Sequence, residues 1–296
     1  MAVNLWIRSA LLSLFAGVAA CAHSGPKSPP LTVDMKPYVG RLVTLDVQVG
    51  ERETHMLFDT GAGVTAVTPE LASAFNCAPF GRLVGHRMSG ERVDFEKCGR
   101  QTISFGAYSA SSDMYVFDLM ALLPEGLPAL GGIVSLASFS DHPFTLDLTG
   151  QKLVIETERS LRERTQNAKQ ADLRIIKGTG GDGEITTLVR IEAETGDLWF
   201  LLDSGNLDHV IVAAHAIDQL GVEIDPETVS NSDNILDLEL EIAGAYSVAV
   251  TARVRDILYD GALNEDVMRR FLITFDLENE NIWFSKADEA GPASDD

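Results

Sequence analysis

The sequence is poor in basic residues. Lys and Arg together number 23, against 44 Asp and Glu, so the formal net charge of the 296 residues is −21. Nucleic acids are bound through basic surfaces that neutralise phosphates, and anionic lipid attracts polybasic patches. The composition therefore argues against nucleic-acid binding and against a polybasic membrane patch. We explain the acidity by solubility.

Clustered metal ligands are also lacking. The histidines are scattered, and His209 and His215 do not have the i, i+4 spacing of a zinc motif. The chain has only three cysteines, and none has a histidine at zinc-ligand spacing. No strand–Gly-x-Ser-x-Gly–helix context surrounds Ser89, which excludes a nucleophile elbow there. We therefore expect no metal and no cofactor.

Long apolar runs are scarce too, and the N-terminal one is short. Arg8 precedes the run Ala10 to Ala20, which is too short to span a bilayer comfortably and has the layout of a secretory signal. The run ends in Val18-Ala19-Ala20-Cys21, which resembles the lipobox of bacterial lipoproteins. That resemblance implies lipidation of Cys21; a plain signal peptide followed by a chance cysteine is the alternative.

From this N-terminus we predict a signal peptide at 1–20 and a lipidated tether at 21–37, rich in Pro and Ser. The expected location is the bacterial cell envelope, facing the periplasm and anchored to a membrane by lipid. The outer membrane is slightly favoured because Ala22 is not the Asp that retains many lipoproteins at the inner membrane.

Two cysteines remain once Cys21 is assigned to the anchor. Exported proteins occupy compartments where disulfides persist, so we hypothesise a Cys77–Cys98 bridge. It would close a loop of about 20 residues and stabilise the fold by roughly 3 kcal/mol in the loop-entropy model. Two buried free thiols are the alternative.

The chain repeats itself. The same 14 positions separate Leu45 from Asp59 and Val189 from Asp203, and both aspartates follow an apolar run and precede a hydroxyl residue and a glycine. Further on, 15 positions separate Gly132 from Asp147 and Gly261 from Asp276, in segments with matching apolar ends. Such matched spacings predict two related lobes.

Short alternating segments with turn signals dominate each lobe, so the fold class is mainly β. The predicted boundaries are 38–156 for the N-terminal lobe, 157–183 for a linker, 184–286 for the C-terminal lobe and 287–296 for a disordered acidic tail.

Two aspartates in twin glycine turns suggest a paired-carboxylate site. Gly61 and Gly205 let the backbone approach the carboxyls closely, and Thr60 and Ser204 offer hydroxyls to the opposite loop. If the lobes face each other about a pseudo-two-fold axis, Asp59 and Asp203 meet. Two carboxylates in contact share one proton, so one is a base for a trapped water and the other an acid.

The doubled apolar–Asp-Thr/Ser-Gly pattern resembles the aspartic proteases of the pepsin and retropepsin kind. A second family element is matched by Gly132-Ile133-Val134-Ser135 and by Gly261-Ala262-Leu263-Asn264. The resemblance covers nearly all of 40–286. It implies two β-barrel lobes with an active-site cleft between them, Asp59 and Asp203 as catalytic residues, and a monomer that acts on peptide or protein substrates.

In this family a β-hairpin flap covers the substrate. The segment Leu83 to Phe95 fits that role, with Met88, Ser89 and Gly90 at its tip; an ordinary hairpin is the alternative. The chain departs from the family at Ser135 and Asn264, which replace glycines, and at Asn206, whose amide could bond Asp203 or crowd the pocket.

Two functions follow. The first is an aspartic endopeptidase of the cell envelope, which the intact Asp pair favours. The second is a non-catalytic peptide- or protein-binding module on the same scaffold, which the three departures favour.

Overall fold

The computed structural model describes residues 29–178, 181–222 and 234–287. The predicted signal peptide at 1–20, the lipidation residue Cys21, and nearly all of the predicted tail at 287–296 lie outside these residues. In the described part of the chain, no helix combines the length and apolarity needed to cross a bilayer.

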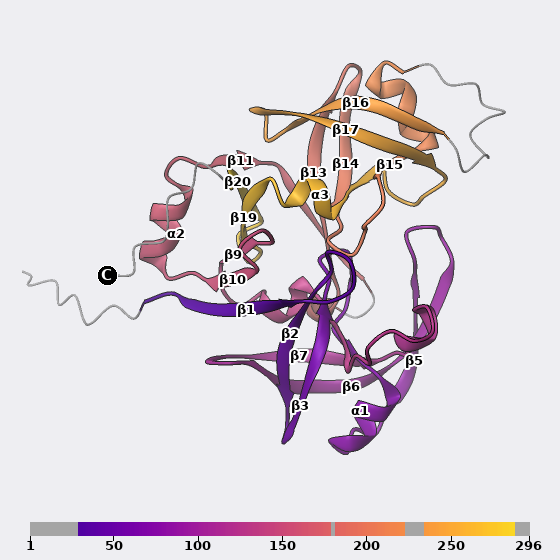
Figure 1. Ribbon diagram of the computed structural model, residues 1–296, viewed down its shortest axis with the longest axis vertical. Coiled ribbons are helices and arrows are strands. Elements are labelled where there is room, and N and C mark those ends of the chain that lie inside the picture. Colours follow the sequence, from indigo (N-terminus) through magenta and orange to yellow (C-terminus); the bar gives the residue numbers. More distant parts are fainter. Residues whose placement is uncertain (1–28, 179–180, 223–233, 288–296) are drawn as a thin grey trace, which may run out of the picture.

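The protein is mainly β, as the alternating pattern predicts, and the strands form two barrel-like lobes joined by a central sheet (Figure 1). The N-terminal lobe comprises β2 (Val43–Val49), β3 (Arg52–Phe58), β4 (Ala66–Val67), α1 (Pro69–Ala74), β5 (Phe80–His86), β6 (Arg92–Phe105), β7 (Tyr108–Val116), the 3-10 helix η1 (Met120–Leu122), β8 (Gly132–Val134) and η2 (Leu136–Phe139).

The C-terminal lobe comprises β12 (Leu173–Lys177), η3 (Gly181–Gly183), β13 (Ile185–Ala193), β14 (Gly196–Leu202), β15 (Val210–Ala213), η4 (Ala214–Leu220), β16 (Ile235–Ile242), β17 (Tyr246–Arg255), β18 (Gly261–Leu263) and α3 (Glu265–Met268). The central sheet and its flank comprise β1 (Leu31–Pro37), β9 (Phe144–Asp147), β10 (Lys152–Ile155), α2 (Glu158–Thr165), β11 (Lys169–Ala171), β19 (Phe271–Asp276) and β20 (Asn281–Lys286).

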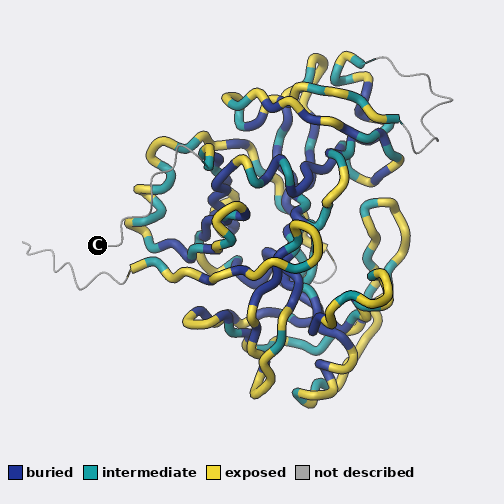
Figure 2. The backbone as a smooth tube through the Cα atoms, in the orientation of Figure 1, coloured by how far each residue is buried: buried dark blue, intermediate teal, exposed yellow. Residues whose placement is uncertain are grey.

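The two lobes use the same strand pairings. In the first, β3 runs parallel to β8, β8 antiparallel to β4, β4 parallel to β7, and β6 closes the barrel by pairing with β2. In the second, β14, β18, β15, β17, β16 and β13 pair in the same senses and close in the same way. Each barrel therefore has six strands among the described residues, and stretches of buried residues run along these strands (Figure 2).

The central sheet has the strand order β11-β20-β19-β9-β10-β1. Its middle pair, β9 and β19, is antiparallel, with Thr145 opposite Thr274 and their hydroxyls 2.9 Å apart. The rings of Phe144 and Phe275 stack beside them, with centroids 5.0 Å apart. This pair of strands fixes the two lobes to each other through a continuous hydrogen-bonded ladder.

The predicted tether at 21–37 is wrong for its last residues. Leu31–Pro37 forms β1, whose first half pairs with β10 and whose second half pairs with β2. Val33 and Met35 are buried on one face. The alternating apolar pattern of this strand is short. By pairing with both β10 and β2, β1 covers two strand edges that would otherwise be unpaired.

Two strands, β11 and β12, lie within the predicted linker at 157–183 and were not predicted. After α2, β11 pairs with β20 of the central sheet, and β12 pairs with β13 of the C-terminal barrel. In the first lobe, the single strand β1 pairs with both the central sheet and the barrel. In the second lobe, β11 and β12 divide these two pairings between them. The C-terminal lobe therefore begins near residue 173, at β12, before the predicted boundary at 184.

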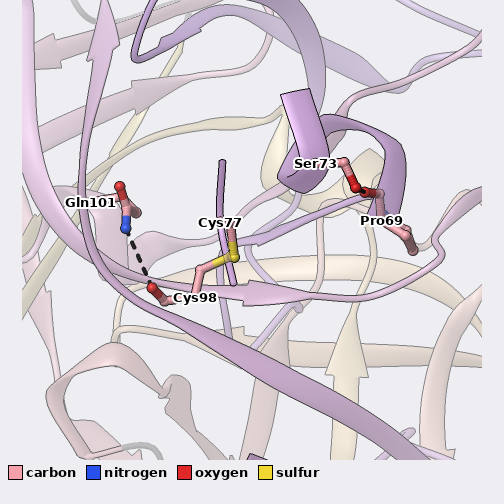
Figure 3. The surroundings of a disulfide bond; sticks show 5 residues. All are labelled: Pro69, Ser73, Cys77, Cys98 and Gln101. Carbon is pink, nitrogen blue, oxygen red and sulfur yellow. Dashed lines mark hydrogen bonds between the residues drawn. A yellow bond between two sulfur atoms is a disulfide. The ribbon is translucent and has the colours of Figure 1, made fainter. Parts of the chain in front are cut away.

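Cys77 and Cys98 form a disulfide in the structure (Figure 3). It joins the segment after α1 to β6, beside the hydrogen bond from the Gln101 side chain to the Cys98 carbonyl. The Cys77 N–H also donates to the Ala72 carbonyl at 2.9 Å, which ties the bridge to the end of α1. The bridge therefore holds the helix against the strand that carries one arm of the predicted flap.

Candidate active site

Asp59 and Asp203 occupy equivalent places at the ends of β3 and β14. The preceding residues, Phe58 and Leu202, are fully buried in the core. The Asp59 N–H donates to the Val134 carbonyl and the Asp203 N–H to the Leu263 carbonyl, each at 3.0 Å. In each lobe the strand β8 or β18 therefore fixes where the chain turns and where the carboxyl points.

The two turns interlock through their hydroxyl residues. The Thr60 N–H donates to Oγ of Ser204, and the Ser204 N–H donates to Oγ1 of Thr60, both at 3.0 Å. The Thr60 hydroxyl in turn donates to the Leu202 carbonyl at 2.7 Å. Both side chains are buried, so these bonds hold the loops together without competition from water.

The glycines allow the loops to approach each other. A Cβ on Gly61 would lie 2.6 Å from Oδ1 of Asp203, and one on Gly205 would lie 2.6 Å from Oδ2 of Asp59. No real Cβ tolerates such a distance, so each loop needs glycine because of the carboxyl in the opposite loop.

Backbone N–H groups converge on the two carboxyls. Gly205 donates to Oδ1 of Asp203 at 3.1 Å and to Oδ1 of Asp59 at 3.2 Å, and Gly61 donates to Oδ1 of Asp59 at 2.8 Å. One nitrogen therefore touches both carboxyls, which also share a hydrogen bond. The structure brings together all the predicted catalytic and supporting residues of the two loops.

Burial shapes the protonation of the pair. Desolvation raises the pKa of Asp59, although the N–H groups of Gly61 and Gly205 counteract it. Desolvation likewise raises the pKa of Asp203, and the neighbouring charge of Asp59 raises it further. Because two adjacent carboxylates repel, the pair retains a proton at a pH where isolated aspartates have lost theirs.

The Asn206 amide neither bonds Asp203 nor crowds the carboxyls. Its Nδ2 donates to the His209 carbonyl at 3.0 Å, and its Oδ1 accepts from the Asp208 N–H at 3.0 Å. The Asn206 backbone N–H donates to the backbone carbonyl of Asp203 at 3.2 Å. The side chain therefore closes its own turn, so the predicted interference does not occur.

The two residues that replace glycine begin helical turns. Ser135 is the N-cap of η2, where its hydroxyl accepts from the Ala137 N–H, and Asn264 is the N-cap of α3, where its Oδ1 accepts from the Val267 N–H. Both have extended backbones. Because these side chains are engaged in caps, the strands β8 and β18 keep their places beside the loops that carry Asp59 and Asp203.

The predicted flap is a hairpin formed by β5 and the first part of β6, and it extends toward the C-terminal lobe (Figure 1). Its turn is closed by hydrogen bonds between Arg87 and Glu91 and from Gly90 to Arg87. Ser89 and Gly90 are exposed at the tip. Met88 is half-buried, and its carbonyl accepts from the Leu258 N–H at 3.0 Å.

Sequence reasoning missed Tyr259, which lies close to Asp203. Its hydroxyl bonds Thr186, and burial, followed by the charges of Glu184 and Asp203, raises its pKa. The available signal was its position directly before Asp260 and the Gly261-Ala262-Leu263 segment.

A search of protein-family models finds no match for this chain, and no curated protein matches its sequence significantly. Within 29–178, 181–222 and 234–287, no three His, Cys, Asp or Glu side chains are grouped so as to hold a metal ion.

Proposed function

We propose that the protein is an aspartic endopeptidase of the pepsin/retropepsin-like kind. In this proposal the lobes are related by a pseudo-two-fold axis that passes between Thr145 and Thr274 and between Asp59 and Asp203. The observation that carries the proposal is the pair of carboxyls held on one backbone nitrogen by interlocked twin loops. The equivalent strand pairings of the two barrels support it as well.

Such a pair hydrolyses a peptide bond with a bound water as nucleophile. One carboxylate takes a proton from the water, whose oxygen forms a bond to the peptide carbonyl carbon, while the protonated carboxyl gives its proton to the carbonyl oxygen. The C–N bond then breaks as the leaving nitrogen receives a proton from the pair. The raised pKa of both groups suits this chemistry, because one proton is present at the start and one at the end.

The substrate in this proposal is a peptide or an unstructured protein segment in a cleft between the lobes, beneath the hairpin tip at Ser89 and Gly90. Both lobes lie in one chain, so we propose a monomer. The N-terminal pattern adds the proposal that Cys21 carries lipid and that the enzyme faces the periplasm.

A peptide library incubated from pH 3 to pH 8 tests the proposal. We expect wild-type protein to cleave, and Asp59→Asn and Asp203→Asn to lose at least ~1,000-fold in kcat/KM, because each removes one half of the proton exchange. Asp141→Asn, an exposed aspartate away from the pair, is the control and keeps full activity.

Two outcomes contradict the proposal: no cleavage by the wild type at any pH, or cleavage that neither pair substitution reduces. Peptide binding without cleavage would indicate the non-catalytic module instead.

A further inference from the structure

One buried carboxylate takes no part in the proposed reaction. Glu265, the first residue of α3, is only 1% exposed. Its counterpart in the other lobe is Leu136, because the two residues follow the matched glycines Gly261 and Gly132 by the same number of positions. Leu136 is buried in the core, so the same place holds an apolar side chain in one lobe and a charge in the other.

Two arginines hold this carboxylate. Nε of Arg41, in the turn between β1 and β2, lies 2.9 Å from Oε2 of Glu265, and Nε of Arg269 contacts Oε1. Arg269 also donates to the Arg41 carbonyl at 2.9 Å and to the Leu148 carbonyl, in the turn between β9 and β10, at 2.5 Å. Burial and the charge of Arg41 lower the pKa of Arg269, so the carboxylate offsets the repulsion between two guanidinium groups. Arg41, Glu265 and Arg269, here called the ionic clamp, therefore join the two lobes and the central sheet.

The other half of the repeat has apolar residues at the corresponding positions. Arg41 lies four positions before Leu45, and the same step back from the matched residue Val189 reaches Ile185, which is buried in the core. A buried ion pair rarely stabilises a fold more than apolar residues in its place, because both charges lose their hydration. Stability alone therefore does not explain why one half of the repeat uses an ion pair here, whereas a directional link between the lobes does.

Backbone hydrogen bonds lead from the clamp to the loop that carries Asp203. The Glu265 N–H donates to the Asn206 carbonyl at 3.1 Å, and the Asp203 N–H donates to the Leu263 carbonyl at 3.0 Å. The clamped segment is thus bonded to both ends of this loop. A shift of the start of α3 would therefore carry the Asp203 carboxyl with it.

We propose that Glu265 is a positioning residue, which through Arg41 sets the place of the Asp203 loop relative to the Asp59 loop of the other lobe. The interlocked hydroxyls hold the Asp203 loop at the residue after the aspartate, and the clamp holds it at Asn206. Two attachment points fix the orientation of the loop, whereas one leaves it free to rotate. The proposal rests on the endopeptidase function, which needs the two carboxyls in contact.

The titration of the carboxyl pair tests this role without any cleavage. The full chain with isotope-labelled aspartate carboxyls is titrated by NMR from pH 3 to pH 10 as wild type, Arg41→Met and Glu265→Leu. Burial and the charge of Asp59 raise the pKa of Asp203 to about 8 in the wild type. The signal is assigned by its loss in Asp203→Asn.

We expect the pair to lose its last proton at least about one pH unit lower in both clamp variants, because a displaced loop separates the carboxyls and admits water. Burial raises the pKa of Tyr259, the other titratable group close to Asp203, so its hydroxyl stays protonated while the pair titrates. Arg41→Lys keeps the charge but not the planar fork, so we expect a smaller shift for it than for Arg41→Met.

Asp266→Asn is the matched control. Asp266 accepts from Nη1 of the same Arg41 at 2.8 Å, but its side chain is half-exposed. We expect this variant to lose stability and to keep the wild-type titration of the pair, because the bond between Arg41 and Glu265 remains. Stability and loop position are thereby measured separately.

The positioning role is overturned if Arg41→Met keeps the wild-type titration, or if Asp266→Asn shifts it equally. Should Glu265→Leu fail to fold, Arg41→Met decides alone, since its half-exposed side chain is easily replaced. In an active enzyme we also expect Arg41→Met to lower kcat about tenfold with KM nearly unchanged, because the loop moves while the walls of the cleft stay in place.

The two proposals fail in different ways. If the wild type cleaves no peptide but the clamp variants shift the titration, the endopeptidase proposal fails and the positioning role stands. If the wild type cleaves and the clamp variants change neither kcat nor the titration, only the positioning role fails.

Discussion

The two lobes have the same strand pairings but differ in what they add to them. The N-terminal lobe carries a disulfide, a hairpin and a long β7–β8 connection, whereas the C-terminal connection between β17 and β18 has five residues. At the loops that carry Asp59 and Asp203 the lobes are nearly interchangeable, with Thr60 facing Ser204 and Gly61 matching Gly205. The difference suggests that the loops which hold the carboxyls tolerate little change, while their surroundings are free to diverge.

The largest effects are expected where the lobes are most alike. Gly61→Ala and Gly205→Ala each place a Cβ 2.6 Å from the opposite carboxyl, so the loops must separate. A displacement of about 1 Å costs roughly 100-fold in rate, and we expect both variants to lose at least that much in kcat/KM. Gly63→Ala is the control, because its Cβ would meet nothing nearer than 3.5 Å. A large loss in only one of the two glycine variants would break the equivalence of the loops.

The next prediction concerns the Cys77–Cys98 disulfide, which the N-terminal lobe has and the C-terminal lobe lacks. Replacing Cys77 and Cys98 together by serine removes the cross-link between α1 and β6. We expect the free energy of unfolding to fall by about 3 kcal/mol in the loop-entropy model, measured by urea denaturation. Dithiothreitol should lower the stability of the wild type similarly and leave the double variant unchanged. If dithiothreitol also lowered the stability of the double variant, its effect on the wild type could not be assigned to the Cys77–Cys98 bridge.

A smaller effect distinguishes the buried carboxyl from an exposed one. Folding raises the pKa of Asp203 above its ordinary value of 3.8, so this group favours folding least when it is ionised. Stability is therefore lost as the pH rises from about 3.8 through the raised pKa. Asp203→Asn should melt at least ~2 °C above the wild type at pH 7, and this gain should disappear near pH 3.5.

Asp266→Asn is the comparison with the opposite sign. The Arg41 guanidinium lowers the pKa of Asp266, so its stabilisation is present at neutral pH and is lost as the pH falls. We expect this variant to melt below the wild type at pH 7 and to approach it in acid. If both variants shift the melting temperature in the same direction at pH 7, the explanation from burial is wrong.

The features predicted correctly from the sequence are those that occur in both halves of the chain. Equal spacings placed Asp59 and Asp203 in equivalent turns, because a repeat constrains both copies at once. The strands β1, β11 and β12 were missed. The partners of β11 and of the first half of β1, which are β20 and β10, lie far away in the chain, so no local pattern points to these pairings. Aligned on their partners in the central sheet, Asp34 of β1 and Asp172 between β11 and β12 occupy the same place, so the repeat extends to these strands.

The surroundings of the site could not be predicted for a different reason. The sequence alone left it open whether the Asn206 amide faces Asp203 or its own turn, because that depends on where His209 and Asp208 place their backbone groups. Likewise, Met88 of the hairpin packs on Leu188, Leu201 and Ala262 of the other lobe, beside the five-residue β17–β18 connection. Contacts of this kind depend on the lengths of two loops that lie far apart in the sequence.

The ladder between β9 and β19 has a consequence for how such a molecule is assembled. Leu146 faces Ile273 and Phe144 faces Phe275 on either side of the Thr145–Thr274 pair, so each strand meets its own counterpart from the other lobe. A contact of this kind is isologous and would serve equally between two identical chains. The contact between β9 and β19 therefore does not depend on the chain segment through α2 that links the two lobes. That segment instead ensures that two different lobes pair, so one lobe can carry a hairpin and a disulfide that the other lacks.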